Sequence, residues 1–413
     1  MTNPREPTRR EFLAASAVGL VGLARGSESL ALGEESQLAD DLLYVGTYTE
    51  GGRTDGIYLV RMDRRSGKLR QVGSVNAGAN PSFLAIHPNG HVLYAVNEFE
   101  KLNGRKTGLV SAFAIASDTG ALTRRNEQPS EGGAPCYVSV DRSGRVVLVA
   151  NYVGGNVALL PIQADGALAP AAHVEQHMGH GPNAARQEAA HAHCIVADPS
   201  NRFVLSADLG VDRVFVYRLD LDGKSLHHIE SGDAVMRPGA GPRHIAFHPT
   251  LPLVFVANEL DSTVATLRFD ARRGALSSLD TRSTVPAGWT GTNYPADIHV
   301  AGSGRTLYVS NRGHNSIAVF SVAPSTGALS LDQVVSTEGD WPRNFSLDPT
   351  GRWLLVANQR SGSVVVFGRD QETGRLTPTR QRIALPSPVC LRFRAHAASP
   401  RGAVVSSISH HES

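Results

Sequence analysis

The stretch GPRHIAFHPTLPLVFVANE, residues 241–259, consists of two apolar segments separated by a turn around His-Pro. Both segments are rich in β-branched and aromatic residues, which predicts two antiparallel strands joined by a tight turn. Five further segments follow the same plan, and each second strand again ends in Asn or Asp: NPSFLAIHPNGHVLYAVNE from Asn80, APCYVSVDRSGRVVLVANY from Ala134, HAHCIVADPSNRFVLSADL from His191, YPADIHVAGSGRTLYVSNR from Tyr294 and WPRNFSLDPTGRWLLVANQ from Trp341.

A second element recurs seven times along the chain. It is a turn in which leucine follows glycine by two or three positions, at Gly67, Gly120, Gly166, Gly223, Gly274, Gly327 and Gly374. The copies are about 50 residues apart, which leaves room for four strands in each unit. Units of four strands at this period are typical of the blades of a β-propeller.

The missing seventh copy of the first element is supplied by the two ends of the repeat region. LLYVGTYTEGG from Leu42 matches a second strand, GIYLV from Gly56 matches a third, and SPVCLRF from Ser387 matches a first. The sequence therefore predicts an all-β fold, a seven-bladed β-propeller closed by N- and C-terminal strands that share one blade. This closure removes the exposed edges of an open sheet. The alternative, a pair of β-sandwiches, does not explain why the two-strand element and the glycine turn both occur seven times.

The N-terminus carries an export-signal pattern. Arg9 and Arg10 precede a short apolar run within TRREFLAASAVGLVGLA, residues 8–24, as in twin-arginine signal peptides. The run is too short to span a membrane, and an uncleaved tail is the alternative. We expect a signal peptide at 1–31, a short leader at 32–41, the propeller at 42–395 and a tail at 396–413. The expected location is the periplasm or the medium, reached through the twin-arginine export machinery.

The composition excludes several classes of partner. The net charge is only +2, so we expect binding neither to nucleic acid nor to a membrane surface. Three cysteines, an odd number without CxxC spacing, do not form a disulfide framework. We expect a monomer.

Charged side chains gather at the strand ends that should meet near the propeller axis. The residues after the second strands include Glu98, Tyr152, Glu259, Arg312 and Gln359, and the first strands begin with His193, Arg243, His244, Arg343 and Asn344. Arginine suits a carboxylate or a phosphate, while Glu and His transfer protons near neutral pH. These residues predict a site for a small anionic, oxygen-rich substrate. The alternative is a channel of polar side chains that only pair with one another and with water.

Four motifs resemble those of the seven-bladed propeller lactonases, a family typified by propeller-type 6-phosphogluconolactonases that includes carboxy-muconate cyclases. They are HGPNAARQEAAHAHC (180–194), GPRHIAFHP (241–249), FVANE (255–259) and VANYVGGNV (149–157), and the resemblance extends from Leu42 to Phe393. It implies a catalytic set of His193, Arg243, Glu259 and Arg312, with His191 able to replace His193. It also implies substrate contacts from Arg186 and Gln187 in the motif loop, beside His191, His244, Glu98, Tyr152, Arg343, Asn344 and Gln359.

The main functional hypothesis is hydrolysis of a sugar-acid lactone without a cofactor. Glu259, with His193, would activate water, and Arg243 and Arg312 would hold the anionic substrate and stabilise the oxyanion. The sequence has no G-x-S-x-G motif for a serine nucleophile. Predicted export separates the chain from the cytoplasm, where phosphorylated sugars are made, and therefore favours another sugar lactone or a carboxylated one.

Two other functions stay open, a lactonising cycloisomerase and a non-catalytic exported propeller that binds a ligand or a partner. A metal site is a further alternative, because five histidines lie between residues 173 and 193. They lack an HExxH pattern, so we predict no metal. His173, His177 and His180 are expected to be loop residues.

Overall fold

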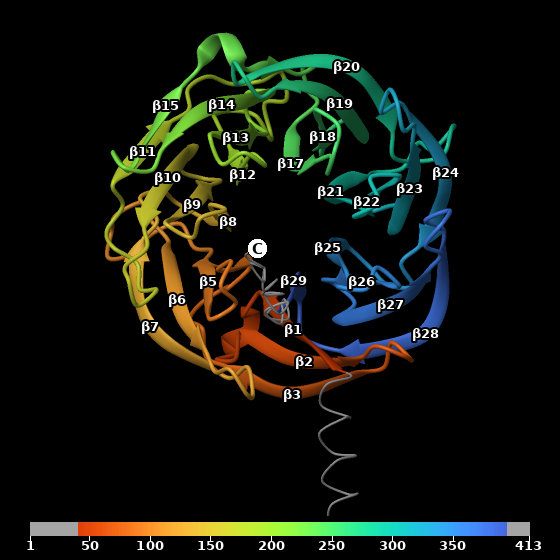
Figure 1. The fold of residues 1–413 in the computed structure, drawn as a ribbon, viewed down its shortest axis with the longest axis horizontal. Coiled ribbons are helices and arrows are strands. Elements are labelled where there is room, and N and C mark those ends of the chain that lie inside the picture. The colour runs from red at the N-terminus through yellow and green to blue at the C-terminus, as the bar shows by residue number, and fades with distance from the viewer. Residues whose placement is uncertain (1–39, 395–413) are drawn as a thin grey trace, which may run out of the picture.

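Seven antiparallel sheets make up residues 40–394, the part of the chain that the computed structural model describes. The predicted signal peptide (1–31), the leader up to residue 39 and the tail (396–413) lie outside the described residues. The sheets are arranged around a common axis with one strand of each sheet innermost (Figure 1). The predicted seven-bladed propeller is confirmed.

The strands of each blade follow one another from the axis outwards. From the innermost strand, blade one is β29 (Pro388–Phe393), β1 (Asp40–Thr47), β2 (Ile57–Asp63) and β3 (Leu69–Val75); blade two is β4 (Leu84–Ile86), β5 (Val92–Asn97), β6 (Leu109–Ile115) and β7 (Leu122–Pro129). Blade three is β8 (Pro135–Val140), β9 (Val146–Asn151), β10 (Asn156–Pro161) and β11 (His173–Gln176); blade four is β12 (Ala192–Ala197), β13 (Phe203–Asp208), β14 (Arg213–Asp220) and β15 (Ser225–His228), with β16 (Ala234–Val235) beside β14.

The remaining blades follow the same order. Blade five is β17 (Pro242–Phe247), β18 (Leu253–Asn258), β19 (Thr263–Asp270) and β20 (Ala275–Ser283); blade six is β21 (Tyr294–Val300), β22 (Thr306–Arg312), β23 (Ser316–Val322) and β24 (Leu329–Ser336). Blade seven is β25 (Pro342–Leu347), β26 (Trp353–Asn358), β27 (Ser363–Arg369) and β28 (Leu376–Ala384). The helical elements of the described chain are two short 3₁₀ turns, η1 (Glu50–Gly52) and η2 (Glu230–Gly232), and no helix among residues 40–394 is long and apolar enough to cross a membrane.

The two ends of the described chain close the ring in blade one. β29 pairs antiparallel with β1, with Val45 opposite Leu391, and the two strands lie side by side in Figure 1. β1 begins at Asp40, slightly before the predicted domain start at residue 42. The shared blade is therefore formed as the sequence predicts.

Neighbouring blades are held together by apolar side chains and by buried tyrosine hydroxyls. Leu43 and Val45 of blade one, for example, pack in one buried cluster with Leu355 of blade seven. The hydroxyl of Tyr44 donates to the carbonyl of Gly120 in the next blade at 2.7 Å, and Tyr94 and Tyr308 repeat the contact with the glycine turns of their neighbours. Gly120 has a φ of +77°, and a Cβ there would meet Leu42 at 2.0 Å. This contact explains why the glycine turn recurs.

A bulge near the start of the inner strands determines which side chains reach the axis. The register with the second strand shifts between Pro135 and Tyr137, and blades four to seven have the same shift at the equivalent place. Two adjacent residues can then point to the same side, contrary to ordinary strand alternation. We call them the third and fourth positions, counted from the start of each repeat: Ser82 and Phe83, Cys136 and Tyr137, His193 and Cys194, Arg243 and His244, Ala296 and Asp297, Arg343 and Asn344, Val389 and Cys390.

The structure differs from the loop prediction for two of the three histidines His173, His177 and His180. His173 is the first residue of β11. His177 is buried, with Nδ1 2.6 Å from Asp208 Oδ2 and Nε2 2.7 Å from the hydroxyl of Tyr217. The other oxygen of Asp208 accepts from the backbone N–H of His191 at 2.7 Å. One carboxylate thus fixes both ends of the loop 177–191.

The closing strand should contribute strongly to stability. Leu391 in β29 is fully buried, and Leu391→Ala should lower the free energy of unfolding by about 2–5 kcal/mol through lost burial and a residual cavity. Leu279→Ala is the matched control, because Leu279 in β20 is 45% exposed. Urea unfolding of both variants measures the effect. Equal losses would contradict a closing role for β29.

Candidate functional site

The residue that follows each second strand is fixed by the first strand of its own blade. In five blades the residue before the proline near the start of the first strand has a positive φ. Its carbonyl accepts the backbone N–H of the residue that follows the second strand. The pairs are Asn80 with Glu98, Ala134 with Tyr152, Gly241 with Glu259, Trp341 with Gln359 and Ser387 with Tyr48. These bonds place the variable side chains beside the third-position side chains at one end of the axis. We call the resulting group the axial cluster: Tyr48, Glu98, Tyr152, Arg186, His193, Arg243, Glu259, Arg312 and Arg343.

Glu259 is the centre of the axial cluster. Its Oε1 accepts from Nη2 of Arg186 at 2.5 Å, and its Oε2 accepts from Nη2 of Arg312 at 2.6 Å. Nε of Arg243 lies 3.0 Å from the same Oε2. The N–H of this third pair is not aimed at the oxygen, so we treat the contact as charge pairing rather than as a directed hydrogen bond. The structure therefore brings together three of the four predicted catalytic residues and Arg186.

This environment changes the charge behaviour of the carboxylate. Burial by itself raises the pKa of Glu259, but Arg312, Arg243 and Arg186 outweigh it and hold the pKa well below its usual range. Burial lowers the pKa of Arg312 to about 9, which leaves it protonated at neutral pH. A carboxylate that is paired with three guanidiniums is a weak base. The geometry therefore opposes the prediction that Glu259 activates water and makes it the anchor of the arginines.

A second layer of polar side chains lies behind Arg243. Nη1 of Arg243 is 3.1 Å from Nε2 of His244, and Nδ1 of His244 is 2.8 Å from Oδ1 of Asp297. Burial and the adjacent Arg243 lower the pKa of His244 to about 3. The neutral ring therefore donates from Nδ1 to Asp297 and accepts from Arg243 at Nε2. Nη1 also donates to the carbonyl of Ala296 at 2.6 Å, whereas Nη2 has no hydrogen-bond partner among the described residues.

Asp297 connects three blades beneath the cluster. Its Oδ2 accepts from the side-chain amide of Asn344 at 2.5 Å and lies 2.9 Å from Nε2 of His299. Asn344 in turn accepts the backbone N–H of Leu391 at 2.7 Å. Both polar atoms of Asn344 are therefore used within the protein, so the structure places it in support of the site and not among free ligand groups.

His193 lies on the third position of blade four with one nitrogen free. Nδ1 is 3.7 Å from Sγ of Cys136, and Nε2 makes no hydrogen bond to any described residue. Burial lowers the pKa of His193 well below its usual value, and the charge of Arg243 adds to the effect. The ring meets Tyr152 edge-on at 5.6 Å. His193 is thus a neutral imidazole whose Nε2 has no hydrogen-bond partner among the described residues.

His191 is placed differently from His193. Its ring stacks on Tyr152 at 4.4 Å, and its nitrogens lie 2.9 Å from the carbonyl of Tyr152 and 3.1 Å from Glu188. Both nitrogens are therefore committed. Gln187 is fully buried, and its amide donates to the carbonyl of Leu209 and to Asp212, each at 2.8 Å. The structure uses Gln187 to hold the motif loop together.

The opposite side of the axial cluster contains Glu98, Tyr48 and Arg343. The hydroxyl of Tyr48 lies 3.0 Å from Oε2 of Glu98, and the hydroxyl of Ser82 also donates to this oxygen. The guanidinium of Arg343 lies over the ring of Tyr48 at 5.4 Å. Gln359 has a buried Oε1 without a hydrogen-bond partner in the described part of the chain.

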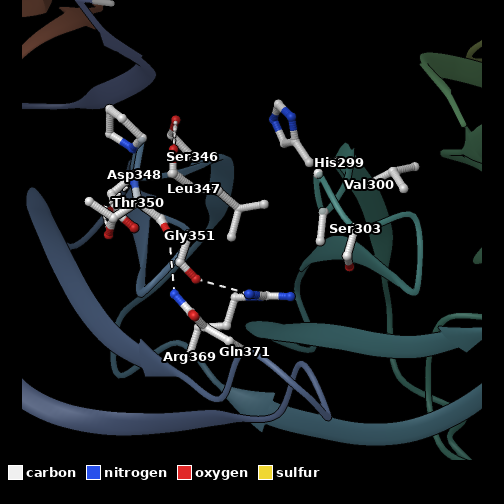
Figure 2. A pocket seen from close by; sticks show the side chains of 13 residues that line it. His299, Val300, Ser303, Ser346, Leu347, Asp348, Thr350, Gly351, Arg369 and Gln371 are labelled. Carbon is white, nitrogen blue, oxygen red and sulfur yellow. Dashed lines mark hydrogen bonds between the residues drawn. The ribbon is translucent and has the colours of Figure 1, made fainter. Parts of the chain in front are cut away.

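A cavity of about 550 Å³ lies away from these residues. It is lined by the turns between the first two strands of blades six and seven, and Figure 2 shows His299 and Ser303 on one side with Leu347 and Arg369 on the other. None of the predicted site residues lines it. In the described part of the chain, no group of three or more His, Cys, Asp or Glu side chains is placed to hold a metal ion.

Asp297 and Cys136 are the residues around the site that were hardest to identify from the sequence. Asp297 lies in YPADIHV, where the equivalent residue of blade five is His244. An alignment of the fourth positions of the seven blades would have shown Asp297 as a charged residue among apolar or neutral ones. Cys136 begins a first strand, but only the structure shows its sulfur beside His193.

Comparisons with known proteins identify the family of the chain. The family model described as "Lactonase, 7-bladed beta-propeller" matches residues 42–393. A 6-phosphogluconolactonase of Bacillus subtilis (strain 168) is 41% identical over 350 residues, 85% of this chain and 97% of that protein. A periplasmic gluconolactonase of Pseudomonas aeruginosa is 34% identical and superposes with a TM-score of 0.80, over 86% of this chain and 99% of the other.

The Glu259 cluster should make stability depend on pH in a defined direction. Because the folded pKa is depressed, the carboxylate stabilises the fold fully above the pKa of an unfolded glutamate, about 4.3, and less as pH falls below it. At pH 7, Glu259→Gln should lower the free energy of unfolding by roughly 3–5 kcal/mol. The difference from wild type should shrink between pH 5 and pH 3 in urea unfolding.

Glu127→Gln provides the control for this experiment. Glu127 pairs with Arg124, but its side chain is 47% exposed, so its removal should cost no more than about 1 kcal/mol. A gap between wild type and Glu259→Gln that stays constant from pH 7 to pH 3 would argue against the charge cluster.

Proposed function

The chain belongs to the seven-bladed β-propeller lactonase family, and from this premise we propose that it hydrolyses a sugar lactone at the axial cluster. The observation that carries the proposal is the presence, in one cluster, of a His193 ring nitrogen and an Arg243 guanidinium nitrogen that both lack a hydrogen-bond partner among the described residues. A proton acceptor and a fixed positive donor are the two groups that hydrolysis of an ester by water requires. The relatives named 6-phosphogluconolactonase and gluconolactonase support this substrate class.

In the proposed reaction His193 is the general base. This scheme assigns the ring proton of His193 to Nδ1, 3.7 Å from the sulfur of Cys136, so that Nε2 holds the lone pair that accepts a proton from water. The water oxygen forms a bond to the lactone carbonyl carbon. The depressed pKa keeps the imidazole of His193 neutral at neutral pH, and it also makes the ring a weaker base than a free imidazole. Glu259 is already neutralised by arginines and does not serve as the base in this scheme.

Arg243 stabilises the negative charge that forms on the carbonyl oxygen. Its Nη2 is available, while Nη1 and Nε are held by His244, Ala296 and Glu259. A donor fixed in this way does not need to reorganise as the charge develops. When the tetrahedral intermediate collapses, the ring C–O bond breaks and His193 returns the proton to the leaving alkoxide. The product is the open hydroxy acid, and no cofactor takes part in these steps.

Hydrolysis can be followed by titrating the acid released from glucono-δ-lactone and its 6-phosphate in a pH-stat. The wild-type protein should exceed spontaneous hydrolysis, and His193→Gln should lower kcat by about 100-fold or more because the general base is lost. Arg243→Gln should lower kcat by a similar factor through loss of the oxyanion donor. His91→Gln and Arg273→Gln, at exposed positions, are the matched controls and should leave the rate unchanged. A rate no faster than buffer for both lactones would disprove the proposal.

We also propose that the protein acts in the periplasm or outside the cell. Support comes from the twin arginines at Arg9 and Arg10 and from the relative named as a periplasmic gluconolactonase. Replacement of both residues by lysine should retain the full-length chain in the cytoplasm of a host with a twin-arginine pathway, as measured by cell fractionation. Equal distribution of the two proteins between the fractions would contradict export by this route.

A further inference from the structure

Arg343 differs from the other arginines of the axial cluster in its partners. Arg186, Arg243 and Arg312 all contact the carboxylate of Glu259. Arg343 forms neither an ion pair nor a hydrogen bond with any described residue, and its guanidinium contacts the face of the Tyr48 ring at 5.4 Å. Its side chain is nevertheless partly buried. A guanidinium that has lost part of its water and has no partner is a prepared site for an anion.

Glu98, a carboxylate whose charge acts on Arg343, does not take the place of that anion. Glu98 is occupied by two hydroxyl groups, those of Tyr48 and Ser82. Burial opposes the charge of Arg343, but the carboxylates of Glu98 and Glu259 help to hold its pKa above the ordinary value, so the guanidinium stays charged. Neither carboxylate forms a direct ion pair with Arg343.

Arg343 lies at the same level of the propeller axis as the proposed reacting groups. It occupies the third position of blade seven, as Arg243 does in blade five and His193 in blade four. Its charge contributes to the lowered pKa of His193, after burial, Arg243 and His244. It contributes in the same way to the lowered pKa of Arg312. The guanidinium therefore lies in the same electrostatic environment as the other members of the cluster.

We propose that Arg343 binds a second, negatively charged group of the lactone, a carboxylate or a phosphate remote from the ester, and thereby selects anionic lactones over neutral ones. This inference rests on the proposed lactone hydrolysis and adds the residue that determines specificity. The planar fork of arginine donates two parallel hydrogen bonds to either anion. The arginines around Glu259 are less suited to this role, because one carboxylate already occupies all three.

The test compares the effect of each variant on three lactones with different remote groups: glucono-δ-lactone (neutral), its 6-phosphate, and glucaro-1,4-lactone (carboxylate), which also has a smaller ring. Arg343→Gln should lower kcat/KM for at least one anionic lactone by about 30-fold or more, mainly through KM. Turnover of the neutral lactone should change little. Arg343→Lys should be intermediate, because lysine keeps the charge and loses the fork. A loss confined to the 6-phosphate identifies phosphate, and a loss confined to glucaro-1,4-lactone identifies carboxylate.

An equal loss for the neutral and both anionic lactones would overturn the inference, since Arg343 would then act at the ester that all three share. Unchanged kcat/KM for all three would also overturn it. Arg273→Gln controls for the loss of one positive charge, because Arg273 is 85% exposed and far from the axial cluster in the turn after β19.

A binding measurement separates this inference from the proposed function. If wild type hydrolyses none of the lactones, lactone hydrolysis is disproved and calorimetry with glucitol 6-phosphate and glucitol decides the role of Arg343. Weaker binding of glucitol 6-phosphate to Arg343→Gln than to wild type, by about tenfold or more, would support the anion site. Equal binding to both proteins, or no preference of wild type for the phosphate over glucitol, would overturn it.

Discussion

The contact between the Glu259 carboxylate and three guanidiniums is the interaction on which the axial cluster depends. Without that negative charge, Arg186, Arg243 and Arg312 would repel one another in a poorly solvated space. With it, each arginine has a fixed direction, and Arg243 keeps one nitrogen free. The same pairing lowers the pKa of Glu259 and makes the carboxylate a weaker base. A residue type that usually indicates proton transfer organises positive charge in this site.

The bulge in the inner strands creates two levels of side chains from adjacent residues. The third positions supply His193, Arg243 and Arg343 to the site, and the fourth positions supply His244, Asp297 and Asn344 beneath it. Asp297 orients His244, and His244 orients Arg243. Because the two levels come from neighbouring residues in each blade, the groups proposed to react and the groups that support them share one backbone segment.

The architecture was predictable because its signals are local and repeated. Two independent counts led to seven blades, and the convergence of Arg243, Glu259 and Arg312 followed from strand ends of blades five and six that meet near the axis. The partners within the site were less predictable. Simple alternation favoured exchange of His191 with His193, but the bulge and the stacking on Tyr152 separate their roles. Contacts such as His177 with Asp208 join residues of different blades, and sequence spacing alone does not reveal them.

Pairing of the last described strand with the first has a consequence for the order of events in the cell. β1 leaves the ribosome early, yet its inner neighbour β29 is synthesised only after blades two to seven. Until then blade one keeps an unpaired edge, and the ring cannot close while translation continues. For the exported chain that we propose, the segment ahead of β1 is therefore available long before there is a finished propeller to transport. Recognition of that segment and completion of the fold have to be separated in time.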